Sequence, residues 1–359
     1  MSLPTRWRTW TRNPTRSLRE WRQRKQLERG PRVVAIGGGT GLPVVLRGLK
    51  KHTANLTAIV TVADDGGSSG RLRGELGILP PGDIRNCLVA LADTEPLMEK
   101  LFQYRFSRGE GLAGHTFGNL FIAAMTEVTG DFEAAVMESS RVLKVRGTVL
   151  PSTLENVTLE AELSDGRLVA GETAVTEESR TAPIVEVRLR PAEPRALPAA
   201  VRAIEAADAV VLGPGSLYTS IVPNLLVPGI RRAVRRASAR GVPVVLVVNV
   251  MTQPGETTGF GAGDHLRVVN DILEGAVNRV VINSERIPPE LVRRYREDGQ
   301  EAVTVPPGLR AFNGVRIVRD RLLDTELLTR ENLVRHHPDR LALAILRASG
   351  RRPDRARVP

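Results

Sequence analysis

The sequence predicts an α/β protein with a mostly parallel β-sheet and a β-rich insertion near the middle of the chain. Short apolar runs, rich in Val, Ile and Leu, alternate with segments whose apolar residues recur at helical spacing. This alternation is typical of parallel sheets in which helices connect successive strands. Between residues 144 and 194 the spacing of the apolar residues changes to two, which indicates antiparallel strands.

The first predicted strand, residues 33–36, runs into a glycine-rich loop. Four glycines within five positions allow a sharp turn and bring backbone N–H groups close to a ligand: Gly37, Gly38, Gly39 and Gly41. A helix is predicted to follow with Thr40 as its N-cap, so that its positive end faces the loop. The spacing is not the dinucleotide fingerprint and lacks the lysine of a P-loop. It therefore indicates an anion without specifying which one, and a tight turn without a ligand is the alternative.

A second loop follows the next apolar run and contains Asp64 and Asp65. Paired carboxylates beside glycine and serine can hold a divalent cation, accept hydrogen bonds from a sugar, or close a turn. Mg²⁺ is the one cofactor that the sequence suggests, with these two aspartates as its candidate ligands. The single cysteine, Cys87, is expected in the core.

Two helix starts carry further polar residues. Asp83 is predicted as an N-cap, and Asn86 falls outside the apolar stripe of the helix that follows. His115 and Asn119 are four residues apart and so share a helix face. We expect His115 to form hydrogen bonds or to be a plain first-turn residue, because the sequence offers this histidine no partners for a metal site.

The insertion is expected to form a hairpin. Residues 157–163 alternate between apolar and polar side chains, residues 164–167 have the composition of a turn, and residues 168–175 are predicted as the returning strand. The segment contains no concentrated chemistry, so we interpret it as a scaffold or an oligomer contact.

Two more polar loops follow apolar runs, at residues 213–220 and 249–258. Because the carboxyl ends of parallel strands meet at one edge of a sheet, these loops should gather there with the first two. Four residues are expected to line a common pocket: Gly39, Asp65, Ser216 and Gln253. Its many N–H and O–H donors suit a phosphorylated, sugar-like or nucleotide ligand.

The formal charge of +11 comes from the two ends of the chain. Residues 1–30 form a basic Arg/Trp arm of net charge +7, residues 347–359 form a basic tail of net charge +4, and the α/β domain between them, residues 31–346, is neutral. The arms could contact polyanions or remain solvated tails. No segment has the length and apolarity of a membrane span or a signal peptide, so a cytoplasmic location is expected.

Six motifs, in this order, resemble those of the bacterial gluconeogenesis factor family, over about residues 31–346. They occupy residues 36–42, 64–72, 80–86, 114–119, 213–220 and 251–257. The family shares a superfamily with 2-phospho-L-lactate transferase. The resemblance implies a Rossmann-like fold with helices on both sheet faces. It also implies a cytoplasmic, homo-oligomeric regulator that binds UDP-sugars such as UDP-N-acetylglucosamine. Such a protein supports cell shape and envelope synthesis during gluconeogenic growth, with a protein partner in amino-sugar or envelope synthesis.

The loops and the motifs together define the candidate ligand-binding residues, to which the resemblance adds two late positions, Tyr295 and Arg335. The others are Gly38, Gly39, Thr40, Gly41, Asp64, Asp65, Gly67, Ser68, Arg71, Asp83, Asn86, His115, Asn119, Gly213, Gly215, Ser216, Thr219, Ser220, Asn249, Thr252, Gln253 and Glu256.

Three functions compete for these residues. The leading hypothesis is a nucleotide-sugar sensor without a catalytic residue. A transferase that acts on a nucleotide-activated donor is the second, with a metal on Asp64 and Asp65 activating an acceptor hydroxyl. A nicotinamide-dependent dehydrogenase is the third, and it lacks both the fingerprint and a well-placed proton donor.

Overall fold

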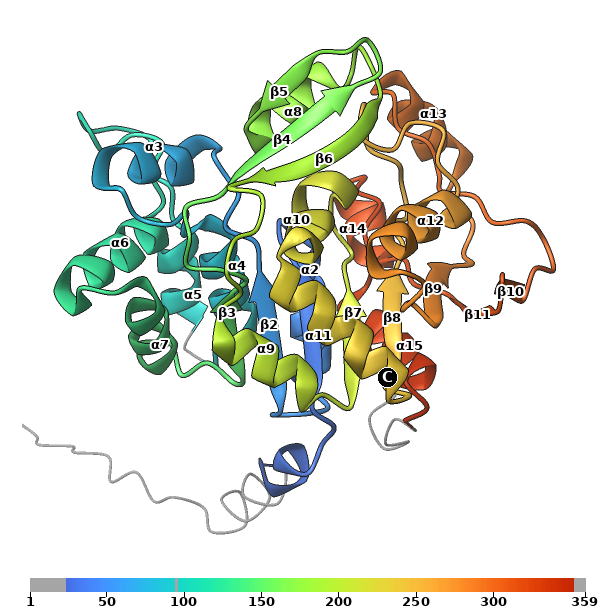
Figure 1. The fold of residues 1–359 in the computed structure, drawn as a ribbon, viewed down its shortest axis with the longest axis horizontal. Helices are drawn as coiled ribbons and strands as arrows, with labels where there is room; N and C mark the ends of the chain where they lie inside the picture. The colour runs from blue at the N-terminus through green and yellow to red at the C-terminus, as the bar shows by residue number, and fades with distance from the viewer. Residues whose placement is uncertain (1–23, 94–95, 352–359) are drawn as a thin grey trace, which may run out of the picture.

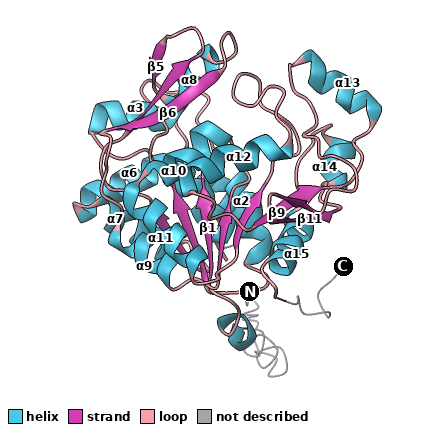
Figure 2. Cartoon of the chain, turned by 45° about the vertical axis from the view of Figure 1, so that its right-hand side comes forward, coloured by secondary structure: helices cyan, strands magenta, loops and turns pink. Residues whose placement is uncertain are grey.

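A computed structural model describes residues 24–93 and 96–351. The main sheet has eight strands in the order β10-β11-β9-β8-β7-β1-β2-β3, and only the pair β10/β11 is antiparallel (Figures 1 and 2). The strands of this sheet are β1 Val33–Gly37, β2 Leu56–Val60, β3 Thr148–Pro151, β7 Ala209–Leu212, β8 Val244–Val247, β9 Arg279–Asn283, β10 Ala311–Phe312 and β11 Val315–Asp320. The prediction of a mostly parallel α/β sheet is confirmed.

The strand order reverses at β1. From β1 the chain builds outward through β2 and β3 on one side, and it then returns to place β7 against the other side of β1. The loops that follow β1 and β7 therefore diverge at this point, which is where open α/β sheets leave a crevice.

Helices cover both faces of the sheet. Helices α2, α4 and α15 pack on one face, whereas α9, α11 and α12 lie on the other (Figure 1). The helices are α2 Gly41–Leu49, α3 Gly67–Leu76, α4 Gly82–Leu91, α5 Pro96–Gln103, α6 Phe117–Thr129, α7 Phe132–Val142, α8 Glu172–Glu178, α9 Pro198–Glu205, α10 Val222–Leu226, α11 Pro228–Ala239, α12 Ala262–Leu273, α13 Pro289–Glu297, α14 Thr325–Arg330 and α15 Pro338–Ala348, with a π-helix η1 at Leu217–Ile221.

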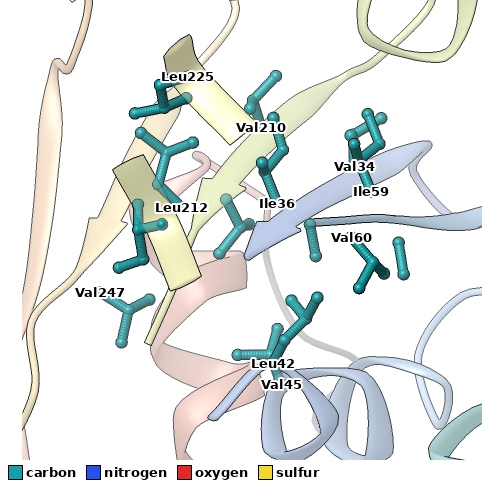
Figure 3. Close-up of a cluster of buried hydrophobic side chains, with 14 of the residues drawn as sticks. Val34, Ile36, Leu42, Val45, Ile59, Val60, Val210, Leu212, Leu225 and Val247 are labelled. Atoms are coloured by element: carbon teal, nitrogen blue, oxygen red, sulfur yellow. The ribbon is translucent and has the colours of Figure 1, made fainter. Parts of the chain in front are cut away.

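The central strands are apolar throughout because both of their faces are covered. Every residue of β1, β7 and β8 is buried. Figure 3 shows Ile36 of β1 among side chains of the neighbouring strands, with Leu42 and Val45 of α2 on one side of the sheet. A buried side chain of this size stabilises the fold by roughly 1.5–3 kcal/mol. This packing holds the loop between β1 and α2 in place.

The insertion is a separate antiparallel sheet, β5-β4-β6, formed by β4 Thr158–Leu163, β5 Leu168–Ala170 and β6 Ile184–Arg190. Strand β4 alternates between buried and partly buried residues, as the period of two predicts. The strand predicted over residues 168–175 is wrong in length, because Gly171 turns the chain with φ +100° and helix α8 begins at Glu172. The separate sheet also takes in fewer residues than the predicted 144–194. Its strands lie between residues 158 and 190, because β3 pairs with β2 in the main sheet.

The segment from residue 24 packs on the α/β body. Leu27 is buried, and its carbonyl accepts a 2.9 Å hydrogen bond from the N–H of Ala54. The rest of the basic arm, residues 1–23, and residues 352–359 lie outside the described part of the chain. In the part that is described, no helix is both long enough and apolar enough to span a membrane.

Candidate functional site

A hollow of about 190 Å³ lies beyond the carboxyl ends of β1, β7 and β8. We call it the switch-point hollow, because the strand order reverses between β1 and β7. Its lining residues are Gly39, Thr40, Gly41, Val44, Pro214, Gly215, Ser216, Asn249, Val250, Met251, Thr252, Gln253, Gln300, Val334, Arg335 and His336.

The glycine loop after β1 forms one wall of the switch-point hollow. Gly39 has φ +61°, a conformation that residues other than glycine rarely adopt. A side chain at Gly41 would place its Cβ 2.3 Å from the carbonyl oxygen of Pro214, so glycine at this position lets the β1 and β7 loops touch. Thr40 is the N-cap of α2, but its side chain forms no capping hydrogen bond. The first N–H groups of α2 therefore remain available to an anion.

Asp83 supports this loop from α4. The helix begins at Gly82, so the prediction of Asp83 as an N-cap is wrong, and its carboxylate instead accepts a 2.6 Å hydrogen bond from the N–H of Gly39. Burial raises the pKa of Asp83 to about 6, the nearby Asp64 adds to this effect, and the hydrogen bond from Gly39 opposes it.

Side-chain amides join the loops that follow β7 and β8. Asn249 accepts from the N–H of Gly215 at 3.1 Å and donates to the carbonyl of the same residue at 2.8 Å. Gln253 donates to the hydroxyl of Ser216 at 2.6 Å. These two amides therefore hold the walls of the hollow together, and Gln253 brings the Ser216 hydroxyl into its lining.

The far wall consists of Val334, Arg335 and His336. Tyr295 does not line the hollow, but its hydroxyl accepts a 2.9 Å hydrogen bond from the N–H of Val334 and so positions this wall. Burial, and secondarily the Arg335 charge, lowers the pKa of His336 to about 4. The imidazole is therefore neutral at pH 7, and its Nε2 is buried without a hydrogen-bond partner among the described residues.

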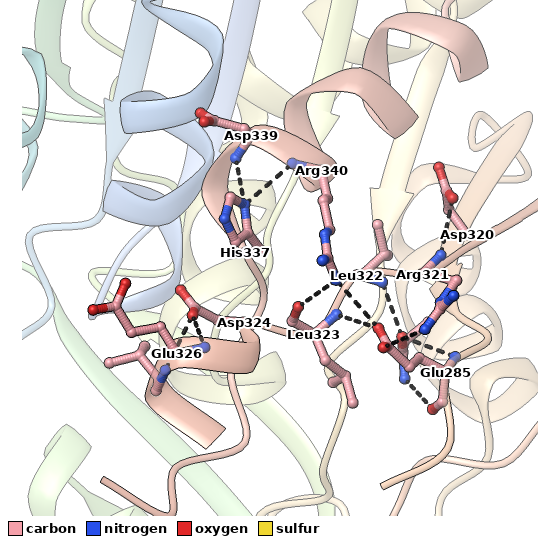
Figure 4. A network of polar contacts seen from close by, with 12 residues as sticks. Glu285, Asp320, Arg321, Leu322, Leu323, Asp324, Glu326, His337, Asp339 and Arg340 are labelled. Carbon is pink, nitrogen blue, oxygen red and sulfur yellow. Dashed lines mark hydrogen bonds and ion pairs between the residues drawn. The ribbon is translucent and has the colours of Figure 1, made fainter. Parts of the chain in front are cut away.

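A network of hydrogen bonds and ion pairs stabilises the segments on either side of residues 334–336 (Figure 4). The Glu285 carboxylate accepts from Arg321 at 3.2 Å, from Arg340 at 3.5 Å and from the N–H of Leu323 at 3.4 Å. His337 caps α15 by accepting from the N–H of Asp339 at 3.2 Å. These contacts fix both ends of the segment that supplies the far wall.

Asp64 and Asp65 lie outside the switch-point hollow and face different partners. Asp64 accepts from the N–H of Gly66 at 2.9 Å, whereas Asp65 accepts from the N–H and the hydroxyl of Thr173 at 2.9 and 2.8 Å. Asp65 thus anchors the start of α8 in the insertion. Within residues 24–93 and 96–351 no group of three or more His, Cys, Asp or Glu side chains is arranged to hold a metal ion. Mg²⁺ can bind through one or two carboxylates together with the phosphates of a ligand, so its assignment to Asp64 and Asp65 stays a prediction.

His115 lies two residues before α6, which begins at Phe117, so the prediction that it shares a helix face with Asn119 is wrong. Both side chains nevertheless belong to one buried hydrogen-bond network. The Ser68 hydroxyl lies 3.0 Å from Nδ1 of His115 and accepts from the Asn119 amide at 3.1 Å. All three side chains are buried, and Arg71 donates nearby to the carbonyl of Ala113 at 2.9 Å. The network joins the first turns of α3 and α6 and does not line the hollow.

The π-helix η1 supplies the floor behind the β7 loop. Thr219 donates to the buried carboxylate of Glu256 at 3.2 Å, and the same carboxylate accepts from the N–H of Tyr218. Asn224, which the sequence analysis missed, donates to the carbonyls of Gly37 and Ser220 at 3.0 and 2.8 Å. A single buried asparagine thus connects the end of β1 with η1.

The structure gathers nine of the candidate residues around the switch-point hollow: Gly39, Thr40, Gly41, Gly215, Ser216, Asn249, Thr252, Gln253 and Arg335. Asn86 lines a neighbouring hollow. The other candidates line neither, namely Gly38, Asp64, Asp65, Gly67, Ser68, Arg71, Asp83, His115, Asn119, Gly213, Thr219, Ser220, Glu256 and Tyr295. Three of the four residues expected to share a pocket do so, and Asp65 does not. Gln300 and His336 were missed, because they come from loops whose sequence has no glycine or hydroxyl cluster.

Comparisons with known proteins place this chain among close relatives. Residues 33–323 match the family model described as 2-phospho-L-lactate transferase CofD. The gluconeogenesis factor of Bacillus subtilis is 48% identical over 87% of this chain and 96% of its own length, and that of Halalkalibacterium halodurans is 46% identical over 89% and 97%. A crystal structure from Bacillus halodurans, of 45% sequence identity, matches 89% of this chain and all of its own with a TM-score of 0.83.

The fold and the hollow define a Rossmann-like α/β protein with a polar crevice at its topological switch point. The chain belongs to the gluconeogenesis factor family, within the superfamily of 2-phospho-L-lactate transferase.

Proposed function

We propose that the protein binds a UDP-sugar, such as UDP-N-acetylglucosamine, in the switch-point hollow and does not consume it. The observation that carries this proposal is the chemistry of the lining. It combines the start of α2 with the hydroxyls of Thr40 and Ser216, and its one charged side chain among the described residues is Arg335. No acidic residue of the described chain lines it. Such a lining favours a diphosphate.

Polar groups beyond the loops suit the rest of the ligand. Gln300 offers an amide to the lining of the hollow, and the neutral His336 of the far wall has an unpartnered ring nitrogen. A base or sugar has donors and acceptors for both, and the unpartnered nitrogen gains a hydrogen bond when the ligand binds. We therefore assign the diphosphate to the glycine loop and the remainder of the ligand to the far wall.

The proposed role is regulatory. The relatives are named gluconeogenesis factors, and we extend the resemblance to a cytoplasmic, homo-oligomeric sensor. In this role the liganded protein acts on a protein partner in amino-sugar or envelope synthesis and thereby supports cell shape during gluconeogenic growth.

A transferase is the second candidate, because the matching family model is described as a transferase. Carboxylates also lie close together near the glycine loop. Burial raises the pKa of Glu172 well above its usual range, and the negative charges of Asp64 and Asp83 raise it further. Acidic groups in such a position could assist transfer from a nucleotide-activated donor.

Calorimetric titration of the full chain tests the proposal with UDP-N-acetylglucosamine, UDP-glucose, GDP and NAD. We expect the UDP-sugars to bind most tightly. Arg335→Gln should weaken their binding at least tenfold, since one charged hydrogen bond is worth roughly 1.5–3 kcal/mol. The control Arg293→Gln removes an exposed arginine of α13 and should have no effect. Tighter binding of GDP or NAD would contradict the proposal.

The two candidates differ in the fate of the ligand. Incubation with UDP-N-acetylglucosamine and Mg²⁺ should return the ligand intact if the protein is a sensor. Steady, protein-dependent release of UDP or UMP that is lost in Asp64→Asn would favour the transferase instead.

A further inference from the structure

A second hollow, of about 320 Å³, lies on the other side of Thr40 from the switch-point hollow. We call it the arginine hollow, because three arginines line it. Arg47 comes from α2, Arg85 from the first turn of α4 and Arg105 from the segment after α5. Elements that are distant in the sequence thus bring three positive charges to one depression.

No acidic side chain neutralises these arginines directly. Among the described residues, none of the three forms an ion pair within 4.0 Å, although many surface arginines of this protein do. Arg105 donates to the backbone carbonyl of Gly114 at 2.6 Å, which leaves its charge uncompensated. Three guanidinium groups that line one depression repel one another, and a bound anion would relieve this repulsion.

Arg85 is held in place by neutral partners. Its Nη1 donates to the hydroxyl of Thr116 at 2.5 Å and its Nη2 to the amide oxygen of Asn86 at 2.7 Å. Its Nε is buried and has no hydrogen-bond partner in the described chain. Burial, and next the charge of Arg105, lowers the pKa of Arg85, while the charges of Asp83 and Asp64 act in the opposite direction.

Helix starts add to the positive potential. Thr40 is the N-cap of α2 and Thr116 is the N-cap of α6, and both line the arginine hollow. Neither hydroxyl caps its own helix, so N–H groups of both first turns lack a side-chain acceptor. The hollow therefore combines guanidinium groups, helix dipoles and the Asn86 amide, which together match a doubly charged oxyanion.

We propose that the arginine hollow binds the phosphate group of a small, hydroxylated phosphomonoester, at the same time as a ligand occupies the switch-point hollow. The volume is at the lower end of the roughly 300–1,000 Å³ typical of small-molecule sites. It leaves room beside the phosphate for a short hydroxylated chain, for which Asn86 and Gln103 supply hydrogen bonds. The inference does not depend on the identity of the ligand in the switch-point hollow.

Calorimetric titration of the full chain with glycerol 3-phosphate tests this site, with glycerol and inorganic phosphate as companion probes. We expect glycerol 3-phosphate to bind more tightly than inorganic phosphate, and glycerol not to bind. Arg47→Gln and Arg105→Gln should each weaken glycerol 3-phosphate at least tenfold. The matched control Arg108→Gln changes an exposed arginine of the Arg105 segment that does not line the hollow, and it should stay within twofold.

Saturating UDP separates the two hollows. Glycerol 3-phosphate should still bind in its presence, and it should still bind to the Arg335→Gln protein. Full displacement by UDP, or unchanged affinity in both Arg47→Gln and Arg105→Gln, would overturn the proposal. Equal affinities for glycerol 3-phosphate and inorganic phosphate would overturn the assignment to a phosphomonoester. Because Arg105 is exposed, its variant should fold normally, and circular dichroism checks this.

Discussion

The carboxylate of Asp83 lies directly beneath the glycine loop and accepts a 2.6 Å hydrogen bond from the backbone N–H of Gly39. The N–H of Gly39 in the proposed phosphate loop is therefore bonded to Asp83. Burial raises the pKa of this carboxyl to about 6. The protonation state of Asp83 thus decides whether a negative charge sits beside the proposed diphosphate site.

Asp83→Asn tests this coupling. A UDP-sugar diphosphate keeps the same charge between pH 5 and 7.5, whereas Asp83 loses its proton as the pH rises through about 6. Repulsion should then weaken binding to the native protein several-fold over this range. The amide variant keeps an acceptor for Gly39 without the charge, so its affinity should stay level in calorimetric titrations. If the native protein and Asp83→Asn lose UDP-sugar affinity equally steeply as the pH rises, Asp83 is not the cause of the pH dependence.

Gly41→Ala should push the β1 and β7 loops apart. The new Cβ would lie 2.3 Å from the carbonyl oxygen of Pro214, a backbone atom that cannot turn away. We expect a loss of about 1–3 kcal/mol in the free energy of unfolding, measured by chemical denaturation, together with weaker UDP-sugar binding. The control Gly74→Ala adds a methyl group to open space in α3 and should stabilise the protein by roughly 0.5–1 kcal/mol. Similar behaviour of the two variants would argue against the loop contact.

Glu256→Gln should change how stability depends on pH. Burial raises the pKa of Glu256 from 4.5 to about 7, although the Tyr218 N–H and Thr219 oppose this shift. The folded protein therefore binds this proton more tightly than the unfolded chain does, so the stability it contributes is complete below pH 4.5 and is lost as the pH rises through 7.

The glutamine variant cannot lose this proton. Between pH 4.5 and 8 its free energy of unfolding should rise relative to the native protein by roughly 2–3 kcal/mol. Denaturation curves at several pH values measure this difference. Glu297→Gln, at an exposed position of α13, is the control and should run parallel to the native protein. If the free energy of unfolding of Glu256→Gln also changes with pH in parallel to that of the native protein, the predicted titration of Glu256 is wrong.

Asp65→Ala should loosen the insertion. Both hydrogen bonds from Thr173 to Asp65 are lost, so amides of residues 158–190 should exchange with solvent faster. Thr173→Val, which removes the hydroxyl donor from the other side, should increase exchange in the same segment. UDP-sugar affinity should stay within a few-fold, because Asp65 does not line the switch-point hollow. A larger loss for UDP-sugar than for UDP would instead make Asp65 a sugar ligand.

The sequence alone determined the class of fold and the edge of the sheet where its polar loops gather. Short β-branched runs such as residues 33–36 are typical of strands covered on both faces, and the carboxyl ends of parallel strands meet at one edge of the sheet. The period of two likewise identified β4, because an exposed sheet needs alternating side chains. These features depend on neighbours along the chain, which a sequence displays directly.

Tertiary structure decided which polar residues line the switch-point hollow and which bond to other parts of the protein. Asp65, Ser68 and Glu256 follow the same strand-end pattern as Ser216, yet their hydrogen bonds go to Thr173, His115 and Thr219. Conversely, Arg47, Arg105 and His336 reach the two hollows from helices and loops without a distinctive sequence pattern. Hydrogen-bond partners and shared cavities are set by residues far apart in the chain, so they emerge only when the sheet and its covering helices are assembled.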